Sequence, residues 1–319
     1  VLGYFKERWV FGKEAKRLAV VGEDCTETDL YGKAKRREKV SLAGKTYDAV
    51  WLLAKYISLT LQDFENIQYL TFTTPETDVD MAKMLKGIGQ HIGVDKEIIN
   101  VQDYKESFCQ YMIFQPKELW QYESALFYCD EDRIKAYMLR RLRVDASHGM
   151  NSFVTVDEVA NAQRKELEAL YPIMNKEKSP DESFKSMIEN VFEKKVISSV
   201  YLTGEGFEKN WYPNSLRVLC NGRRAFMGNN LYSKGACYKS IRKCEPNDDG
   251  PIYLDETKLT ERICLRMRVD GQEGWYPLVT WGTHWYEADG QWEVLLEDAS
   301  DIEILVESLV DEEVQMEKV

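Results

Sequence analysis

Residues 196–238 read VISSVYLTGEGFEKNWYPNSLRVLCNGRRAFMGNNLYSKGACY, and this stretch decides the fold class. Val196–Thr203 is rich in β-branched and apolar residues, which predicts a buried strand. The glycines at 204 and 206 predict a turn at its end. A helix, a second short strand and a helix opened by Asn229-Asn230 follow. Strands that alternate with helices in this way indicate an α/β sheet.

The residues before this stretch continue the alternation of strands and helices. Ser179 and Glu182 form a capping box with Pro180 at the first helical position, which predicts a helix that leads into the strand at 196–203. Periodicity places the remaining elements. We expect strands at 67–74, 98–101 and 125–129, a hairpin partner at 133–142, a helix buried between layers at 47–64, a buried helix at 105–114, a helix capped by Asp78 and an amphipathic helix at 157–171.

The first 45 residues are predicted with less regular structure. Residues 1–17 are basic and amphipathic, which favours a short helix or an extended arm. Residues 22–45 are rich in charge, and we expect a solvated loop or helix face there. Arg17–Val20 is expected to form an early strand.

The character of the sequence changes after the turn residues 246–251. Short alternating runs from 252 to 314 predict a small all-β module, with hairpin turns at Asp270-Gly271 and Asp289-Gly290. We therefore predict a core of residues 1–250 and a β module of residues 251–319. Its aromatic residues are expected to fill a small core, and a peptide or glycan groove is the alternative. The tryptophans concerned are Trp275, Trp281, Trp285 and Trp292.

Composition limits the function. The 319-residue chain has a net charge of −12 and a pI near 5.0, so its overall field repels nucleic acid and anionic membranes. No apolar run approaches the length that spans a bilayer, and the start of the chain has no secretory apolar segment. Seven irregularly spaced cysteines indicate reduced thiols and a cytoplasmic protein. With three histidines and no CxxC pair, we expect no structural zinc.

The order of elements in residues 196–238 resembles that of the actin, hexokinase and DnaK-type chaperone superfamily. The chain closely resembles an uncharacterised family of bacterial actin/DnaK-like proteins over most of its length. The matching stretches are GYFKERWVFGKEAKRL at 3–18, ESF at 106–108, FQPKELW at 114–120 and GNNLYSKGACY at 228–238. This resemblance implies ribonuclease-H-type α/β lobes followed by the small β module, and it implies that Gly235-Ala236 lets the last helix pack tightly against neighbouring backbone.

The resemblance also implies a nucleotide site. Gly204, Glu205, Gly206 and Phe207 would border an adenosine pocket, although Glu205 separates two glycines that are usually adjacent. The alternative is that these glycines only turn the chain. Asp130 stands at the second phosphate-binding turn, where Glu131 and Asp132 replace the usual glycine-containing sequence. Three consecutive acids repel a triphosphate unless a cation intervenes, so an exposed hairpin tip is the favoured interpretation.

The first phosphate-binding hairpin is missing from the sequence. It should follow Arg17–Val20, but the chain passes directly to Val21–Cys25. We therefore expect an incomplete first lobe, or a chain joined across missing residues near Val20-Val21. Glu106 is either a hinge carboxylate or a helix-start acid, and the second is favoured.

These features predict a protein of nucleotide-binding fold that hydrolyses ATP weakly or not at all. We expect it to act in the cytoplasm as a scaffold or adaptor for a protein partner, without binding nucleic acid or membranes. ATP with magnesium is the cofactor that the resemblance implies, and the altered motifs leave its binding open. The alternatives are an active chaperone-like ATPase and an actin-like polymerising protein. Other catalytic motifs, such as a nucleophile elbow, a P-loop or HExxH, are absent from the sequence.

Overall fold

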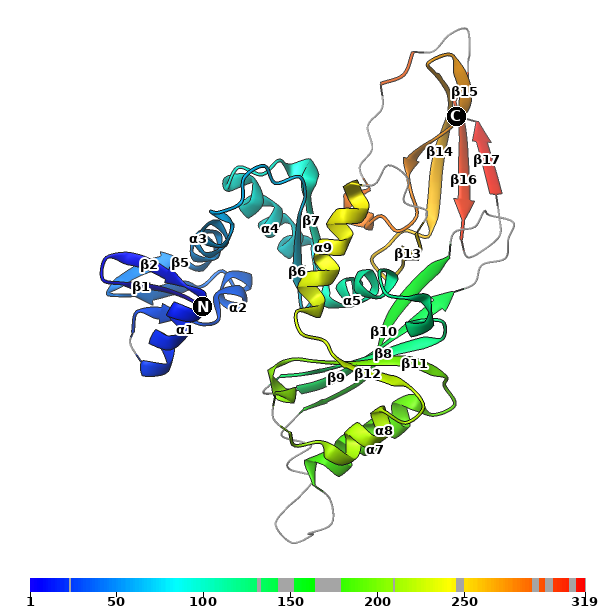
Figure 1. The fold of residues 1–319 in the computed structure, drawn as a ribbon. Coiled ribbons are helices and arrows are strands. Elements are labelled where there is room, and N and C mark those ends of the chain that lie inside the picture. The colour runs from blue at the N-terminus through cyan, green and yellow to red at the C-terminus, as the bar shows by residue number, and fades with distance from the viewer. Residues whose placement is uncertain are drawn as a thin grey trace. The chain divides into compact units, whose positions relative to one another are not determined.

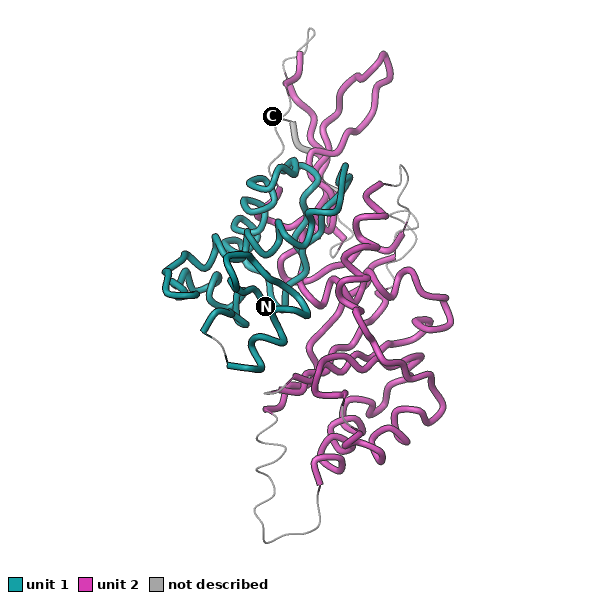
Figure 2. The backbone as a smooth tube through the Cα atoms, turned by 60° about the vertical axis from the view of Figure 1, so that its left-hand side comes forward, with its two compact units in different colours: residues 1–102 teal, residues 103–319 magenta. Residues whose placement is uncertain are grey.

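The computed structural model describes residues 1–22, 24–130, 133–142, 152–163, 179–208, 210–244, 250–288, 293–295, 301–309 and 314–318. The chain divides into two compact units, residues 1–102 and residues 103–319 (Figures 1 and 2).

The first unit combines small sheets with helices. Its elements in chain order are β1 (Leu2–Phe5), β2 (Arg8–Phe11), α1 (Gly12–Val21), β3 (Thr26–Glu27), α2 (Leu30–Lys35), β4 (Lys39–Leu42), β5 (Lys45–Asp48), α3 (Ala49–Leu61), β6 (Leu70–Thr74), α4 (Val79–His91), η1 (Lys96–Ile98) and β7 (Ile99–Asp103). The sheets are β2-β1-β3, β4-β5 and β6-β7. As predicted, α4 begins at Asp78, whose carboxylate accepts a hydrogen bond of 2.7 Å from Met81 N.

Several predictions for the first unit are wrong. Residues 2–11 form a β-hairpin, because Tyr4 and Trp9 lie opposite each other as cross-strand aromatic partners. The expected strand at Arg17–Val20 is part of α1, whose Lys, Glu and Ala residues favour a helix. Residues 22–45, expected to be a solvated loop or helix face, include the short helix α2, which is capped by Asp29, and this agrees with the second form of that prediction. The helix at 47–64 is confirmed as α3, but it buries one side only and leaves Trp51 exposed.

The second unit is built on a six-stranded sheet. Its strands are β8 (Glu123–Cys129), β9 (Arg133–Leu142), β10 (Phe153–Gln163), β11 (Ile197–Thr203), β12 (Arg224–Met227) and β13 (Ile252–Tyr253), in the order β12-β11-β8-β9-β10-β13. The pairs β12–β11, β11–β8 and β10–β13 are parallel, whereas β8–β9 and β9–β10 are antiparallel. The α/β class, the strand at 196–203 and the hairpin of 125–129 with 133–142 are therefore confirmed.

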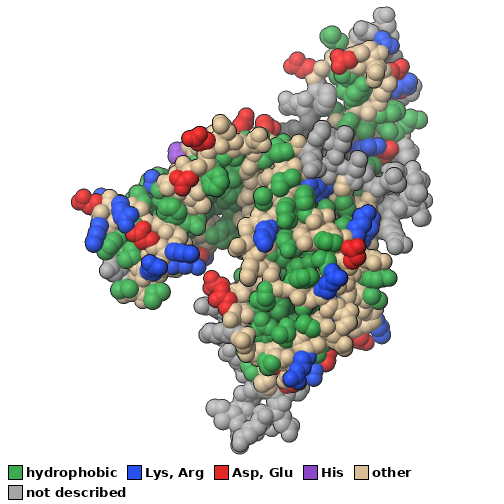
Figure 3. All heavy atoms as spheres, in the orientation of Figure 1, with side chains coloured by type: hydrophobic (Ala, Val, Ile, Leu, Met, Phe, Trp, Pro, Cys, Tyr) green, Lys and Arg blue, Asp and Glu red, His purple; other side chains and the backbone are tan. Residues whose placement is uncertain are grey.

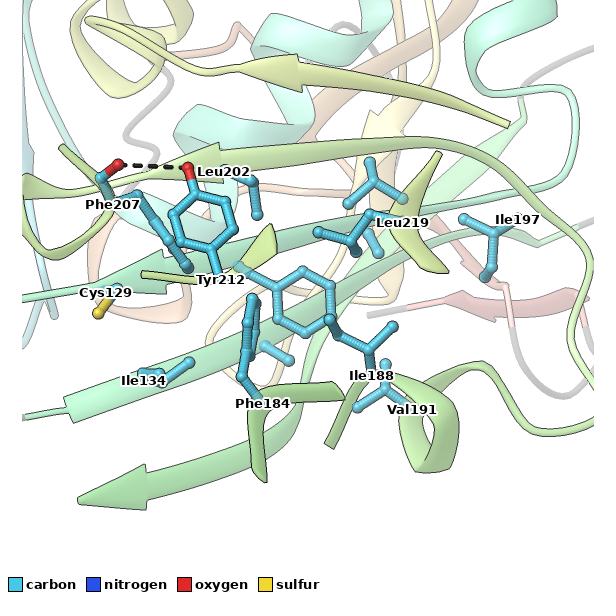
Figure 4. Close-up of a cluster of buried hydrophobic side chains, with 14 of the residues drawn as sticks. Cys129, Ile134, Phe184, Ile188, Val191, Ile197, Leu202, Phe207, Tyr212 and Leu219 are labelled. Atoms are coloured by element: carbon cyan, nitrogen blue, oxygen red, sulfur yellow. Dashed lines mark hydrogen bonds between the residues drawn. The ribbon is translucent and has the colours of Figure 1, made fainter. Parts of the chain in front are cut away.

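Helices cover both faces of this sheet (Figure 1). One face carries α5 (Tyr104–Ile113) and α9 (Leu231–Cys244), together with η2 (Lys117–Leu119). The other carries α7 (Pro180–Phe192) and α8 (Pro213–Leu219), and α7 begins at the predicted Ser179 cap. Figure 4 shows the core on this second face, where Phe184, Phe207 and Tyr212 pack together.

The predicted helix at 157–171 is wrong for the residues that the structure describes. Residues 157–163 belong to β10 and pair with β9 along its whole length, with a bulge between Glu158 and Ala160. The apolar residues of this stretch recur with a helical period, but pairing with β9 decides the conformation. The bulge accounts for part of this period, because an extra residue shifts the side-chain alternation of the strand. Residues 164–171 lie outside the described part of the chain.

A separate antiparallel sheet of order β15-β14-β16-β17 follows. Its strands are β14 (Glu261–Val269), β15 (Gln272–Val279), β16 (Glu303–Ser308) and β17 (Val314–Lys318), and η5 (Trp285–Glu287) precedes β16. The hairpin at Asp270-Gly271 is confirmed: both residues have positive φ, as a tight β-hairpin turn requires. Asp289-Gly290 lies outside the described residues. The predicted division at 250/251 remains a prediction, and β13 belongs to the six-stranded sheet rather than to this one.

The tryptophans of this module differ in burial. Trp281 is buried, as predicted, and packs with Phe153, Leu254 and Leu309. Trp275 and Trp285 are 37% and 58% exposed, so the core prediction is wrong for both. Trp292 lies outside the described residues.

Two general predictions concern thiols and membranes. All seven cysteines lie in described residues and are free thiols, four of them buried. Among the described residues, no helix has the length and apolarity needed to cross a bilayer.

Candidate functional site

The turn after β11 lies directly against the end of β8, its parallel neighbour. Gly204 has a φ of +100°, and a Cβ there would overlap the carbonyl oxygen of Cys129. A Cβ at Gly206 would overlap the Cys129 sulfur. Both glycines therefore allow close packing of this turn on β8, which side chains would prevent.

The other residues predicted to bind nucleotide lie around the same point. Glu205 is exposed, whereas Phe207 is buried in the core between the sheet and α7. Trp211 Nε1 donates a hydrogen bond of 2.8 Å to Gly206 O. Asp130 follows β8, and its carboxylate accepts a hydrogen bond of 2.7 Å from Arg133 N within the hairpin turn.

The structure thus brings the five predicted residues together at the ends of two parallel strands. Their binding of adenosine remains a prediction. The turn residues do not fit a magnesium-bound triphosphate, since the glycines face Cys129 and the sequence at 130–132 consists of three acids. In the described part of the chain, no group of three or more His, Cys, Asp or Glu residues could hold a metal ion.

A second polar site is built where α5 crosses α9. A Cβ at Gly235 would overlap the backbone oxygen of Ser107, so the two helices approach each other at backbone distance. This close approach is the tight packing that the resemblance implied for Gly235-Ala236. It places Glu106 of α5 beside Lys239 of α9.

Glu106 is buried and has cations on two sides. Its Oε1 lies 3.2 Å from Lys239 Nζ, and its Oε2 lies 3.1 Å from Lys258 Nζ. The side chains of Glu106 and Lys258 are 3% and 4% exposed. Burial alone would raise the pKa of Glu106, but the charges of Lys258 and Lys239 outweigh it and hold this pKa well below its ordinary value. The carboxylate is therefore ionised and ion-paired.

His284 extends this arrangement. Burial, followed by the charge of Lys258, lowers the pKa of His284, so the ring is neutral near pH 7. Lys258 Nζ lies 2.9 Å from Nε2, and an ammonium can only donate, so Nε2 accepts and Nδ1 carries the proton. Nδ1 then donates to Thr257 Oγ1 at 2.9 Å, which donates to Asp255 Oδ1 at 2.7 Å. The resulting hydrogen-bond chain fixes the orientation of the Lys258 ammonium toward Glu106.

We call Glu106, Lys239, Lys258 and His284 the Glu106 cluster. Asp103 lies at the start of the same helix and caps it by accepting a hydrogen bond of 2.7 Å from Glu106 N. Burial raises the pKa of Asp103 to about 6. The Glu106 carboxylate within the cluster is thus ionised. The nearby Asp103 carboxylate titrates close to neutral pH.

Sequence reasoning found only part of this cluster. It considered Glu106 and favoured a helix-start acid, which the macrodipole stabilises. Glu106 does lie in the first turn of α5, but it is also buried and ion-paired. Lys258 and His284 were missed, since nothing in their local sequence indicates a distant carboxylate. The one sequence signal that pointed to this cluster was that His284 is one of only three histidines in the chain.

Comparison with known proteins divides the chain within the Glu106 cluster. Residues 1–256 match the C-terminal region of a family of unknown function, DUF5716. The chain belongs to the DUF5716 family. Residues 258–319 match a domain of unknown function, DUF8552. No curated protein matches the chain. Glu106 and Lys239 lie in the DUF5716 region, whereas Lys258 and His284 lie in the DUF8552 region, so the buried Glu106–Lys258 ion pair joins the two.

Proposed function

We propose that this DUF5716 protein is a binding scaffold built on an actin/DnaK-like lobe that does not hydrolyse ATP efficiently. Support for the lobe comes from the strand order β10-β9-β8-β11-β12, with three antiparallel strands followed by two parallel ones. Helices on both faces of such a sheet are the arrangement expected of a ribonuclease-H-type lobe. The crossing of α5 and α9 at Gly235 adds to this support.

One observation carries the non-catalytic part of the proposal. In the turns that would hold a nucleotide, the glycines and the aspartate contact neighbouring protein groups. Gly204 and Gly206 pack on Cys129, and the Asp130 carboxylate accepts a hydrogen bond from Arg133 N within its own hairpin turn. Phosphoryl transfer needs donors and cations preorganised around the transferred group. Three acids in a row at 130–132 carry the same negative charge as a triphosphate and repel it. These residues therefore favour binding functions over hydrolysis.

The scaffold part of the proposal is supported by how the two family regions are joined. The DUF8552 region is connected to α5 and α9 by the buried Glu106–Lys258 pair and to β10 by the cluster of Phe153 and Trp281. A module held by buried contacts presents its surface in a fixed orientation relative to the sheet. A cytoplasmic location is part of the same proposal and is supported by the free thiols.

Phosphate release by the purified chain in ATP and magnesium tests the proposal. We expect release at the level of buffer alone, for the wild type and for Asp130→Asn alike. Asp63→Asn, which changes an exposed acid to its amide in the same way, is the matched control. Steady release that Asp130→Asn abolishes and Asp63→Asn preserves would refute the proposal.

A further inference from the structure

The segment from 210 to 244 has an unusual charge. It contains seven Lys and Arg residues and no Asp or Glu, in a chain whose net charge is −12. This segment forms α8, β12 and α9. Lys239 is paired with Glu106, and Arg242 Nη1 donates to Gln110 at 2.9 Å. Arg224 of β12 and Lys234 of α9 are exposed, whereas Arg217 lies on α8, which covers the other face of the sheet.

A line of ring contacts runs from the helices to the edge of the sheet, and its middle member, Tyr201, is buried. Phe114 stacks on Tyr238 with ring centroids 4.4 Å apart, and Tyr238 lies 6.1 Å from Tyr111. Tyr111 contacts Tyr201 at 5.7 Å, and Tyr201 stacks on Phe226 at 5.2 Å. The two ends of this line, Phe114 and Phe226, are 38% and 37% exposed.

The line ends on a strand whose outer edge is open. β12 is the last strand of its sheet and, among the described residues, pairs only with β11. This strand has three exposed residues, Arg224, Phe226 and Met227, and the exposed fraction of Met227 is 50%. Figure 3 shows hydrophobic side chains gathered on this face over α5, α9 and β12, with Lys and Arg side chains among them. An exposed edge strand offers backbone donors and acceptors to a further strand.

We propose that this surface, the β12 face, binds an acidic, extended segment of a protein partner. The segment adds as a strand beside β12, its carboxylates lie near Arg224 and Lys234, and its apolar side chains cover the exposed part of Phe226. The inference rests on the proposed scaffold role, because it names the class of partner that the scaffold binds.

Charge complementarity selects this occupant. A basic patch with exposed apolar residues matches a segment that alternates acidic and apolar side chains, as β-strand addition requires. A long nucleic acid fits less well, since it extends beyond the local patch and meets the field of the −12 chain. The exposed apolar side chain of Ile241 also favours apolar side chains over bases.

Selection of random short peptides displayed on phage, with the full chain as bait, tests the inference. We expect enriched peptides to be acidic and to carry apolar residues at alternate positions. Synthetic copies should bind more weakly as salt rises. Arg224→Glu and Phe226→Ser should each weaken binding about tenfold or more. Circular dichroism should show that both variants are still folded, although Phe226→Ser loses its contact with Tyr201 and should melt at a lower temperature. Lys185→Glu, a charge reversal on α7 on the opposite face of the sheet, is the control and should leave binding unchanged.

The opposite outcomes overturn the inference. These are selected peptides that are not acidic, an empty selection, or binding that Arg224→Glu and Phe226→Ser do not alter. If single-stranded DNA binds instead, or the chain self-associates, and the same two variants abolish this, the face has a different occupant. Phosphate release is measured on the same preparations: hydrolysis with peptide binding intact refutes only the non-catalytic proposal, and loss of peptide binding without hydrolysis refutes only this inference.

Discussion

Glu106 is ionised in the interior of the protein because Lys258 and Lys239 lie on either side of it. Two charges removed from water are tolerated together when each neutralises the other, and removing one of them leaves the other without compensation. The contribution of Glu106 to stability therefore depends more on Lys258 than on Lys239. Lys258 is nearly as deeply buried as Glu106, whereas Lys239 is partly exposed.

Glu106→Gln should destabilise the second unit strongly. It keeps the size of the side chain but leaves the Lys258 ammonium buried without a counter-charge, at a cost of about 3–5 kcal/mol in the free energy of unfolding. Urea unfolding followed by circular dichroism measures this change. Glu256→Gln is the matched control: its partner is Lys105 at 3.4 Å, its side chain is 78% exposed, and its loss should cost less than about 1 kcal/mol. Equal effects of the two substitutions would contradict the role given to burial.

Asp103 should make stability depend on pH. Its pKa is about 6 in the folded chain because burial disfavours the charged form, and its ordinary value is 3.8. A carboxyl whose pKa is raised on folding stabilises the folded state while it is protonated, so this contribution is lost as pH rises from about 4 to about 6. Asp103→Asn removes the titration and keeps a good N-cap.

The measurement for Asp103 is the difference in unfolding free energy between Asp103→Asn and the wild type at several pH values. This difference should shift in favour of the variant by about 1–3 kcal/mol between pH 4 and pH 7. A difference that stays flat over this range would show that Asp103 has an ordinary pKa.

At the scale of elements, the crossing of α5 and α9 places the Glu106 cluster. Gly235→Ala puts a methyl group onto the Ser107 backbone, and backbone cannot move aside as a flexible side chain can. We expect a loss of about 1–3 kcal/mol or more in unfolding free energy. Gly87→Ala in α4 is the control, because a Cβ there meets nothing within 4 Å. It should stabilise by about 0.5–1 kcal/mol, since alanine favours helices. Similar results for the two variants would show that the helices do not meet at Gly235.

The sequence predicted those elements whose signals are local. Ser179 and Asp78 cap helices as expected, and the positive φ values of Asp270 and Gly271 follow from their turn chemistry. It failed where a partner strand decides the conformation, as at residues 157–163 beside β9. For the same reason it located the turn at Gly204 but not the Glu106 cluster, which depends on residues far apart in the chain.

At the scale of the whole molecule, contacts of different kinds connect the described residues of the two family regions. The Glu106–Lys258 pair supplies a polar connection, and the packing of Phe153 and Leu254 with Trp281 and Leu309 supplies an apolar one. The separate sheet of the DUF8552 region has its own ion pairs, such as Arg266 with Glu303 at 2.7 Å. Weakening the connection should therefore loosen that sheet without unfolding the six-stranded one.

Lys258→Met tests this division through amide hydrogen exchange. We expect the exchange of amides in β14 and β16 to rise more than that of amides in β8 and β11, by about tenfold or more, which corresponds to about 1.4 kcal/mol. Arg266→Met is the control, because it removes ion pairs within the separate sheet and leaves the Glu106 cluster intact. It should change exchange only slightly, since exposed ion pairs contribute little. An equal rise in β8 and β11 would show that Lys258 stabilises both sheets of the second unit alike, and unchanged exchange in β14 and β16 would show that the apolar contacts hold the DUF8552 region without it.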